Sequence, residues 1–263
     1  MKFSEKSIEK SVKMIVTDLD GTLLSSDLTI SERTVAILNQ CKEVGIKLVY
    51  ATGRGGSAET LTPAALFDGK ITLNGAIVKI DDTIVHNCLI PYQLAQPILT
   101  ACDKRGLLVV SEAGDKHYSN FAITDLWPTF TNFEITDFSQ HTKDAEKIYF
   151  TKLTLEDEKF IEEQLPDSLY MVISRIYDMA MIMHKGATKS QGISVLAQMW
   201  GISPSEIVAF GDDMNDMDML SYAGIGVAMG NSIDEIKAVS KCVCRSNDEN
   251  GLAEWLWENV LRT

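Results

Sequence analysis

The chain lacks the features that mark secreted, membrane-spanning and disulfide-stabilised proteins. Its 263 residues include five cysteines, an odd number, with no Cys-x-x-Cys pair and no histidine at zinc-ligand spacing. No apolar run approaches the roughly 18 residues of a membrane span. The first 13 residues are charged and lack the apolar stretch of a secretory signal. We therefore expect a cytoplasmic protein with reduced thiols.

Basic residues are also scarce. The 24 Lys and Arg residues face 37 Asp and Glu residues, which gives a formal net charge of −13. This balance argues against a nucleic-acid or anionic-membrane partner, because both attract a basic face. An anionic small molecule is still possible, since a bound cation and a few local bases can reverse the field inside a pocket. The length and the 45% hydrophobic content favour two domains.

Strands and helices alternate at both ends of the chain. Ser31 is a plausible helix N-cap, and Gly45 closes that helix. Another helix follows Thr188 and ends at Gly201. Apolar runs that predict buried strands cover 14–17, 46–51, 71–73, 207–210 and 225–229. This alternation predicts an α/β fold, a Rossmann-like parallel sheet with helices on both faces.

The pattern changes between about Thr83 and His184, where strand-like runs multiply. Helices are expected only around 92–102, with Pro97 causing a kink or a late start, and around 156–165. Closely spaced strands with few helices favour an α+β unit with a largely antiparallel sheet. The simplest organisation is a core domain made of residues 12–82 and 186–263, with residues 83–185 inserted as a second domain.

Two carboxylates, Asp18 and Asp20, stand where the first buried strand ends. Alternate side chains of an extended chain share a face, and Gly21 then allows a sharp turn. In open α/β sheets, ligands bind at this carboxyl edge. Two acids so close repel each other, so the site holds a cation, shares a proton, or both. Carboxylate oxygens are the ligands that Mg²⁺ prefers.

Further polar clusters follow other predicted strands or open a predicted helix. Thr52, Gly53 and Arg54 come directly after the second strand, where a hydroxyl and backbone N–H groups can bind an anionic oxygen. A simple turn with Thr52 as a helix cap is the alternative. Lys189 opens the helix that Thr188 caps, and a cation there opposes the helix dipole. The mismatch indicates that Lys189 faces a strong negative charge elsewhere.

The third cluster is Gly-Asp-Asp-Met-Asn-Asp at 211–216, directly after the strand at 207–210. A helix N-terminus explains one or two of these acids. The remaining acids repel one another unless a metal offsets them.

The order of these segments resembles the haloacid dehalogenase (HAD) superfamily. The segments are Asp-Leu-Asp-Gly-Thr-Leu, Ala-Thr-Gly-Arg, a lysine opening a helix, and Gly-Asp-Asp-Met-Asn-Asp. The similarity is closest to its Cof-type sugar-phosphate phosphatases and includes Asn-Gly-Ala at 74–76. The middle of the chain resembles the type IIB cap domain in position and length. One departure is Thr-Lys-Ser at 188–190, where the subfamily often has Ser-Lys-Gly.

The resemblance implies a Mg²⁺-dependent phosphatase of small phosphorylated metabolites, sugar phosphates above all. Asp18 would be the nucleophile that forms an aspartyl-phosphate, and Asp20 the general acid and base. Implied metal ligands are the Asp18 side chain, the Asp20 carbonyl and Asp212. Asp216 and Asp213 would support the metal site without binding the ion directly. Residues implied to bind the substrate phosphate are Thr52, Gly53, Lys189 and Asn215.

The resemblance also implies that the cap domain sets substrate selectivity. Polar residues at the ends of its strands are candidates, although each is better explained as a plain surface residue: Glu112, His117, Arg175 and Tyr177. Two other functions stay open. A phosphomannomutase-like phosphomutase would return the phosphoryl group to another hydroxyl, and a sensor on the same fold would bind a phosphometabolite without turnover.

Overall fold

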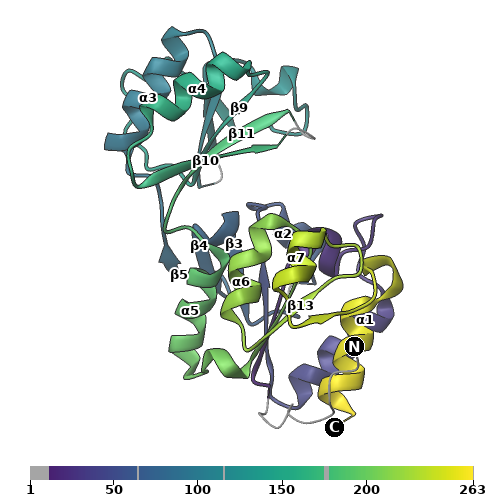
Figure 1. Cartoon of the computed structure of the whole chain (residues 1–263). Helices are drawn as coiled ribbons and strands as arrows, with labels where there is room; N and C mark the ends of the chain where they lie inside the picture. Colours follow the sequence, from purple (N-terminus) through teal and green to yellow (C-terminus); the bar gives the residue numbers. More distant parts are fainter. Residues whose placement is uncertain (1–11, 64, 115, 175–177, 263) are drawn as a thin grey trace. The chain divides into compact units, whose positions relative to one another are not determined.

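The chain divides into two units in the computed structural model, which describes residues 12–63, 65–114, 116–174 and 178–262. Cys88–Ala187 forms one unit. The segments before and after it fold together as the other, which we call the core unit (Figure 1). The two-unit organisation therefore has the inserted arrangement that the sequence predicts.

The core unit is built on an eight-stranded sheet in the order β14-β13-β12-β1-β2-β3-β4-β5. Neighbours from β14 to β3 are parallel, and β4 and β5 add an antiparallel edge. The strands are β1 (Met14–Thr17), β2 (Lys47–Ala51), β3 (Gly69–Thr72), β4 (Ile77–Ile80), β5 (Thr83–Asn87), β12 (Ile207–Gly211), β13 (Ile225–Ala228) and β14 (Cys242–Val243). β1 lies at the centre, so the chain after it emerges in the middle of the sheet's carboxyl edge.

The predicted division after Asp82 differs from the structure. β5 pairs with β4 across the tight turn at Asp81 and Asp82, so it belongs to the core sheet. The short turn makes this pairing local, and the inserted unit therefore begins at Cys88 and ends at Ala187. The sequence shows β5 as an apolar run but does not show its partner.

Helices cover both faces of the core sheet because successive strand residues point to opposite sides. Ile15 packs with α1 (Glu32–Glu43) and α8 (Gly251–Leu256). Met14 and Val16 pack with α5 (Lys189–Trp200), α6 (Met217–Tyr222) and α7 (Asp234–Val239). A short helix, α2 (Ala58–Leu61), completes the unit (Figure 1). Ser31 caps α1 as expected, since its side chain accepts the Thr34 N–H.

The inserted unit is a six-stranded sheet in the order β10-β11-β9-β6-β7-β8. Its pairs are antiparallel except β7 with β8. The strands are β6 (Leu108–Ala113), β7 (Lys116–Ser119), β8 (Phe133–Ile135), β9 (Lys147–Thr151), β10 (Leu169–Ser174) and β11 (Met179–His184). Helices α3 (Tyr92–Lys104) and α4 (Leu155–Gln164) pack on one face through Leu99 and Ile161. The α+β architecture agrees with the sequence prediction.

Of the two outcomes predicted at Pro97, a kink or a late start, the late start is wrong. α3 begins at Tyr92 and runs through Pro97 to Lys104. Its buried face, which includes Ile98 and Leu99, packs into the apolar cluster of the unit. This burial outweighs the local cost of a proline within the helix.

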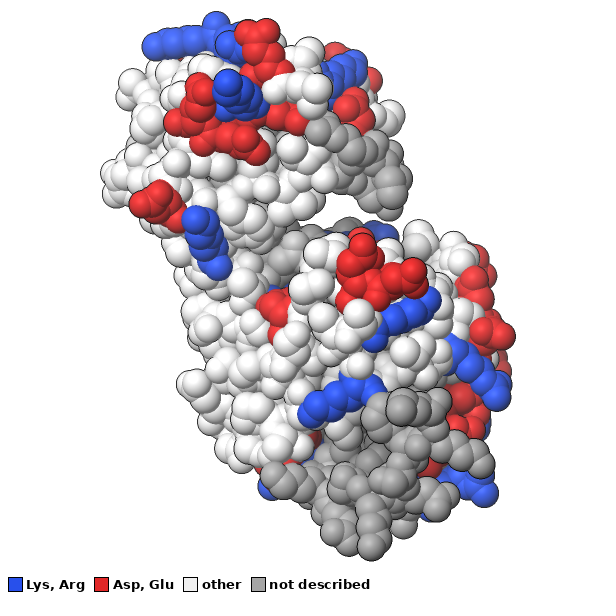
Figure 2. Space-filling view, viewed as in Figure 1, with Lys and Arg blue, Asp and Glu red and all other residues white. Residues whose placement is uncertain are grey.

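Surface charge is mixed where it can be seen. In the view of Figure 2, Asp and Glu side chains lie beside Lys or Arg side chains on both units. The surplus negative charge therefore forms no continuous acidic face in that view. All five cysteines are free thiols. Along the described ranges, none of the helices combines the length and apolar content that crossing a bilayer requires.

Candidate active site

The site begins where β1 ends, at the centre of the core sheet. The Asp18 N–H donates to the Phe210 carbonyl at 3.0 Å, which ties the end of β1 to β12. The chain then enters a wide turn over Leu19–Leu23, in which Gly21 has a φ of +74°. A Cβ atom at Gly21 would collide with the Asp212 carboxylate. Glycine is therefore needed both for the turn and for the approach of Asp212.

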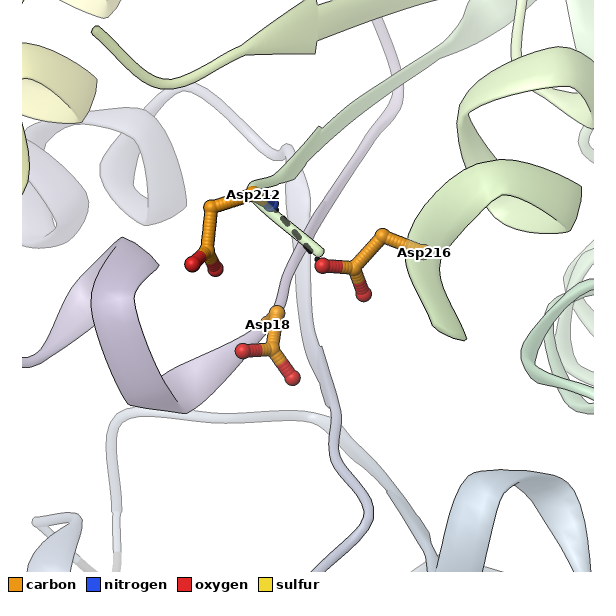
Figure 3. Close-up of side chains that lie close together, drawn as sticks. All are labelled: Asp18, Asp212 and Asp216. Carbon is orange, nitrogen blue, oxygen red and sulfur yellow. Dashed lines mark hydrogen bonds between the residues drawn. The ribbon is translucent and has the colours of Figure 1, made fainter. Parts of the chain in front are cut away.

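Three carboxyl groups converge at this edge. Asp18, Asp212 and Asp216 each place an oxygen within 4.8 Å of the others. Figure 3 shows the three side chains around one small space, with the Asp212 N–H bonded to Asp216. Asp212 follows β12, and its carboxylate accepts the Thr22 hydroxyl at 2.7 Å. Clustered carboxylate oxygens are a donor set that suits Mg²⁺, so the residues fit that ion.

Lys189 supplies the opposing charge. Its Nζ donates to Asp18 Oδ1 at 2.6 Å and to Asp216 Oδ1 at 2.5 Å. The three residues come from the end of β1, α5 and the turn after β12, and Lys189 and Asp216 are almost completely buried. The strong negative charge that the helix-opening position of Lys189 predicts is thus provided by Asp18 and Asp216.

Burial governs the protonation of this cluster. It raises the pKa of Asp18; the Lys189 ammonium opposes this shift, and Asp216 and Asp212 add to it. Burial alone would lower the pKa of Lys189, but its two carboxylate partners raise it above the ordinary value. Burial also raises the pKa of Asp212 to about 6, with Thr22 lowering it and Asp216 and Asp213 raising it. A bound cation would favour the ionised carboxylates.

Asp216 also organises the backbone of its own loop. Its Oδ2 accepts the N–H groups of Asp212 at 2.9 Å and Asp213 at 3.1 Å. A Cβ atom at Gly211 would collide with the Asp216 side chain. The exposed Asp213 carboxylate accepts the Met214 N–H at 2.7 Å and caps the short turn Met214–Asp216. Asp216 therefore fixes where Asp212 lies, whereas the bonds of Asp213 are local.

The loop after β2 presents Thr52, which is 1% exposed. The Thr52 N–H donates to the Ile71 carbonyl at 2.9 Å, and the Thr52 hydroxyl accepts the Arg54 N–H at 3.1 Å. Next to it, a Cβ atom at Gly53 would lie 3.2 Å from Asn74 Oδ1. Asn215 donates to that same Asn74 oxygen at 3.1 Å. The loops after β2, β3 and β12 thus meet at one edge of the sheet.

The second predicted acid, Asp20, has a partner that the sequence does not identify. Arg54 donates through Nε to Asp20 Oδ2 and through Nη2 to Asp20 Oδ1, both at 2.6 Å. The sequence feature that could have identified Arg54 as a site residue is its position directly after Thr52 and Gly53. Asn74 is the second missed residue, and the Asn-Gly-Ala tripeptide marks it.

The candidate selectivity residues lie in the inserted unit. Glu112, on β6, is 8% exposed and pairs with Lys147 at 3.2 Å. His117, on β7, lies 3.3 Å from the Tyr149 hydroxyl through Nδ1. These two are paired residues of the sheet rather than plain surface positions. Arg175 and Tyr177 lie outside the described residues.

Comparison with known proteins places the chain in a family. The sequence pattern of the haloacid dehalogenase-like hydrolases matches residues 15–256. The 5-amino-6-(5-phospho-D-ribitylamino)uracil phosphatase of Bacillus subtilis is 27% identical over 271 residues, covering 95% of this chain and 98% of that protein.

Solved structures give the same assignment. A phosphatase of the HAD superfamily from Bacteroides thetaiotaomicron has a TM-score of 0.82 at 27% identity, over 97% of this chain and 99% of that one. A HAD subclass IIB sugar phosphatase has a TM-score of 0.78 at 26% identity, over 94% and 98%. The predicted resemblance is confirmed: the chain belongs to the haloacid dehalogenase-like hydrolase family and has the fold of its subclass IIB phosphatases.

Proposed function

We propose that this phosphatase is Mg²⁺-dependent and hydrolyses small phosphorylated metabolites, sugar phosphates among them, through an aspartyl-phosphate on Asp18. The observation that carries the proposal is the buried Lys189 ammonium between Asp18 and Asp216, beside Asp212. Two of the similar proteins are named as a sugar phosphatase and a phosphoribitylamino-uracil phosphatase, and both names describe small phosphorylated substrates.

The reaction needs two displacements at phosphorus. An Asp18 oxygen attacks the phosphorus atom, the bond to the leaving oxygen breaks, and Asp20 gives that oxygen its proton. Asp20 then takes a proton from water as the water oxygen attacks the same phosphorus. The bond between phosphorus and Asp18 breaks, which releases inorganic phosphate and restores both acids.

Asp18, the Asp20 backbone carbonyl and Asp212 are the groups that would hold Mg²⁺, with Asp216 and Asp213 behind them. When bound, the ion offsets the negative charge that otherwise opposes the approach of an anionic substrate to Asp18. Asp216 contributes by fixing the Asp212 backbone, as described above. Burial, and to a smaller extent the neighbouring Asp216 and Asp213 carboxylates, raise the pKa of Asp212 and so disfavour its ionised form, which a bound cation would favour.

Phosphoryl oxygens would be bound by Thr52, the Gly53 N–H, Lys189 and Asn215. Thr52 Oγ1 accepts the Arg54 N–H, so its own proton can point to a phosphoryl oxygen. Fixed donors of this kind stabilise charge that develops in the transition state. We also propose that the inserted unit sets substrate selectivity, with Glu112 and His117 as its candidate residues.

Release of inorganic phosphate tests the proposal. Sugar phosphates, phosphorylated nucleosides and phosphorylated cofactors are compared with Mg²⁺ and with chelator, beside Asp18→Asn. We expect release that requires Mg²⁺ and is lost in the variant. Turnover only when a sugar bisphosphate is added would indicate a mutase. Binding without turnover would indicate a sensor.

A further inference from the structure

Asp20 and Arg54 form a two-point ion pair. Each carboxylate oxygen accepts one guanidinium N–H at 2.6 Å, and both side chains are partly exposed, at 43% for Asp20 and 31% for Arg54. Ion pairs with this exposure contribute little to stability. The two parallel hydrogen bonds instead fix the plane and direction of the carboxylate, which one hydrogen bond would leave free to rotate.

The backbone of Arg54 is itself held in place. Its N–H donates to the Thr52 hydroxyl at 3.1 Å, and its carbonyl accepts the Leu73 N–H at 2.9 Å. Arg54 therefore moves with the loop that presents Thr52. Through the guanidinium, the Asp20 carboxylate is tied to the same loop, although Asp20 lies on the turn after β1.

We infer that Arg54 is the positioning residue for Asp20, and this inference rests on the proposed function. The pair sets the general acid in a fixed relation to the hydroxyl that would hold the phosphoryl group. A carboxylate has about four acceptor sites, so the two bonds from Arg54 leave sites for a proton. Arg54 thus acts through Asp20 and contributes most when the leaving oxygen needs that proton.

Two substrate types separate this role from direct phosphate binding. The leaving group of a sugar phosphate is an alkoxide, which must be protonated. The leaving group of p-nitrophenyl phosphate is p-nitrophenolate, which is stable without a proton. Arg54→Met keeps most of the length of the side chain and removes the guanidinium with its two parallel donors. We expect kcat/KM, which reports the attack by Asp18 and the loss of the leaving group, to fall by about 10²-fold for the sugar phosphate and to change little for p-nitrophenyl phosphate. Hydrolysis of the aspartyl-phosphate, in which Asp20 acts as the base, is the same for both substrates and does not enter kcat/KM.

Two further variants sharpen the test. Arg54→Lys keeps the charge but not the paired donors, so we expect a kcat/KM between those of Arg54→Met and the wild type. Arg33→Met is the matched control, because Arg33 pairs with Glu254 through one bond at 3.0 Å on the far helices α1 and α8. It should leave kcat/KM unchanged. Adding Arg54→Met to Asp20→Asn should cause no further loss on the sugar phosphate.

The inference is overturned by an equal loss of kcat/KM on both substrates or by additive effects in the double variant. Each of these would make Arg54 a phosphate-binding or merely structural residue. Arg54→Lys answers the same question if Arg54→Met does not fold. If the wild type releases no phosphate from any substrate with Mg²⁺, the proposed function fails instead.

Discussion

At the scale of single residues, burial gives ordinary side chains their chemistry. Lys189 is 1% exposed and Asp216 is 0% exposed, so their interaction is hardly screened by water. Asp18 also accepts a hydrogen bond from the Lys189 ammonium, through Oδ1. This bond fixes the orientation of the carboxylate that we propose as the nucleophile.

Replacing Asp18 with Asn removes the proposed nucleophile and keeps the size of the side chain. We expect phosphate release to fall by about 10³-fold or more. The fold should persist, because Lys189 keeps Asp216 as a partner and one of three crowded acids is neutralised. Phosphate release and thermal unfolding measure the two effects. Substantial remaining turnover would remove Asp18 from the nucleophile role.

Replacing Lys189 with Met leaves two buried carboxylates without their cation. Breaking a buried pair in this way costs about 3–5 kcal/mol of unfolding free energy. Lys47→Met is the control, because Lys47 is 41% exposed and pairs with Asp68 at 3.3 Å, and such pairs contribute about 0–1 kcal/mol. Urea unfolding of both variants gives the comparison. Equal costs would show that the Lys189 cluster is not a stabilising interaction.

At the scale of elements, the site is made by the turns that follow β1, β2, β3 and β12. Parallel strands end at the same edge, so residues distant in sequence meet there. The hydrogen bond from Asp18 to Phe210 and the bond from Asn215 to Asn74 join these turns. The geometry of each turn therefore determines the geometry of the site.

Gly21→Ala tests that dependence. Gly21 and Gly45 both have positive φ, +74° and +90°, so alanine at either position costs about 1–2 kcal/mol. Only at Gly21 would the new Cβ meet a site residue, the Asp212 carboxylate, whereas at Gly45 nothing lies within 4 Å. We expect Gly21→Ala to lose phosphate release and Gly45→Ala to keep it. Similar phosphate release by the two variants, each measured equally far below its own unfolding temperature, would contradict this.

At the scale of the whole molecule, the chain has two cores with separate hydrophobic clusters. In the described residues, one apolar cluster of the inserted unit lies around α3 and α4 and a smaller one around Val110 and Tyr149, and two others flank the core sheet. The carboxylate cluster belongs to the core unit alone. A ligand of that cluster should therefore stabilise the core unit directly.

We expect Mg²⁺ to raise the melting temperature of the core unit more at pH 7.5 than at pH 5. Folding raises the pKa of Asp212 from 3.8 to about 6. Between these values the folded state holds a proton that the unfolded state has lost, so metal-free stability falls as the pH rises through this window. The ion must displace that proton at pH 5 but not at pH 7.5. Calorimetry with Mg²⁺ and with chelator measures the shift, and Asp212→Asn is the control that should abolish it.

Local sequence pattern was enough to predict the main elements and the candidate residues. A continuous apolar run marked β1, and the Ser31 cap marked the start of α1. The acids at Asp18 and Asp212 were identified by their place after buried strands. The alternation of strands and helices at both ends of the chain, and its change in the middle, predicted the parallel sheet and the inserted unit, with which the family resemblance agreed.

Contacts within the tertiary structure set which residues pair and where the units divide. β5 joins the core sheet because it pairs with β4, and α3 runs through Pro97 because its buried face packs into a core. The partners of Lys189 and the fork from Arg54 to Asp20 also depend on contacts between distant segments. Local sequence carries little information about such contacts, since burial and pairing arise only when the whole sheet has formed.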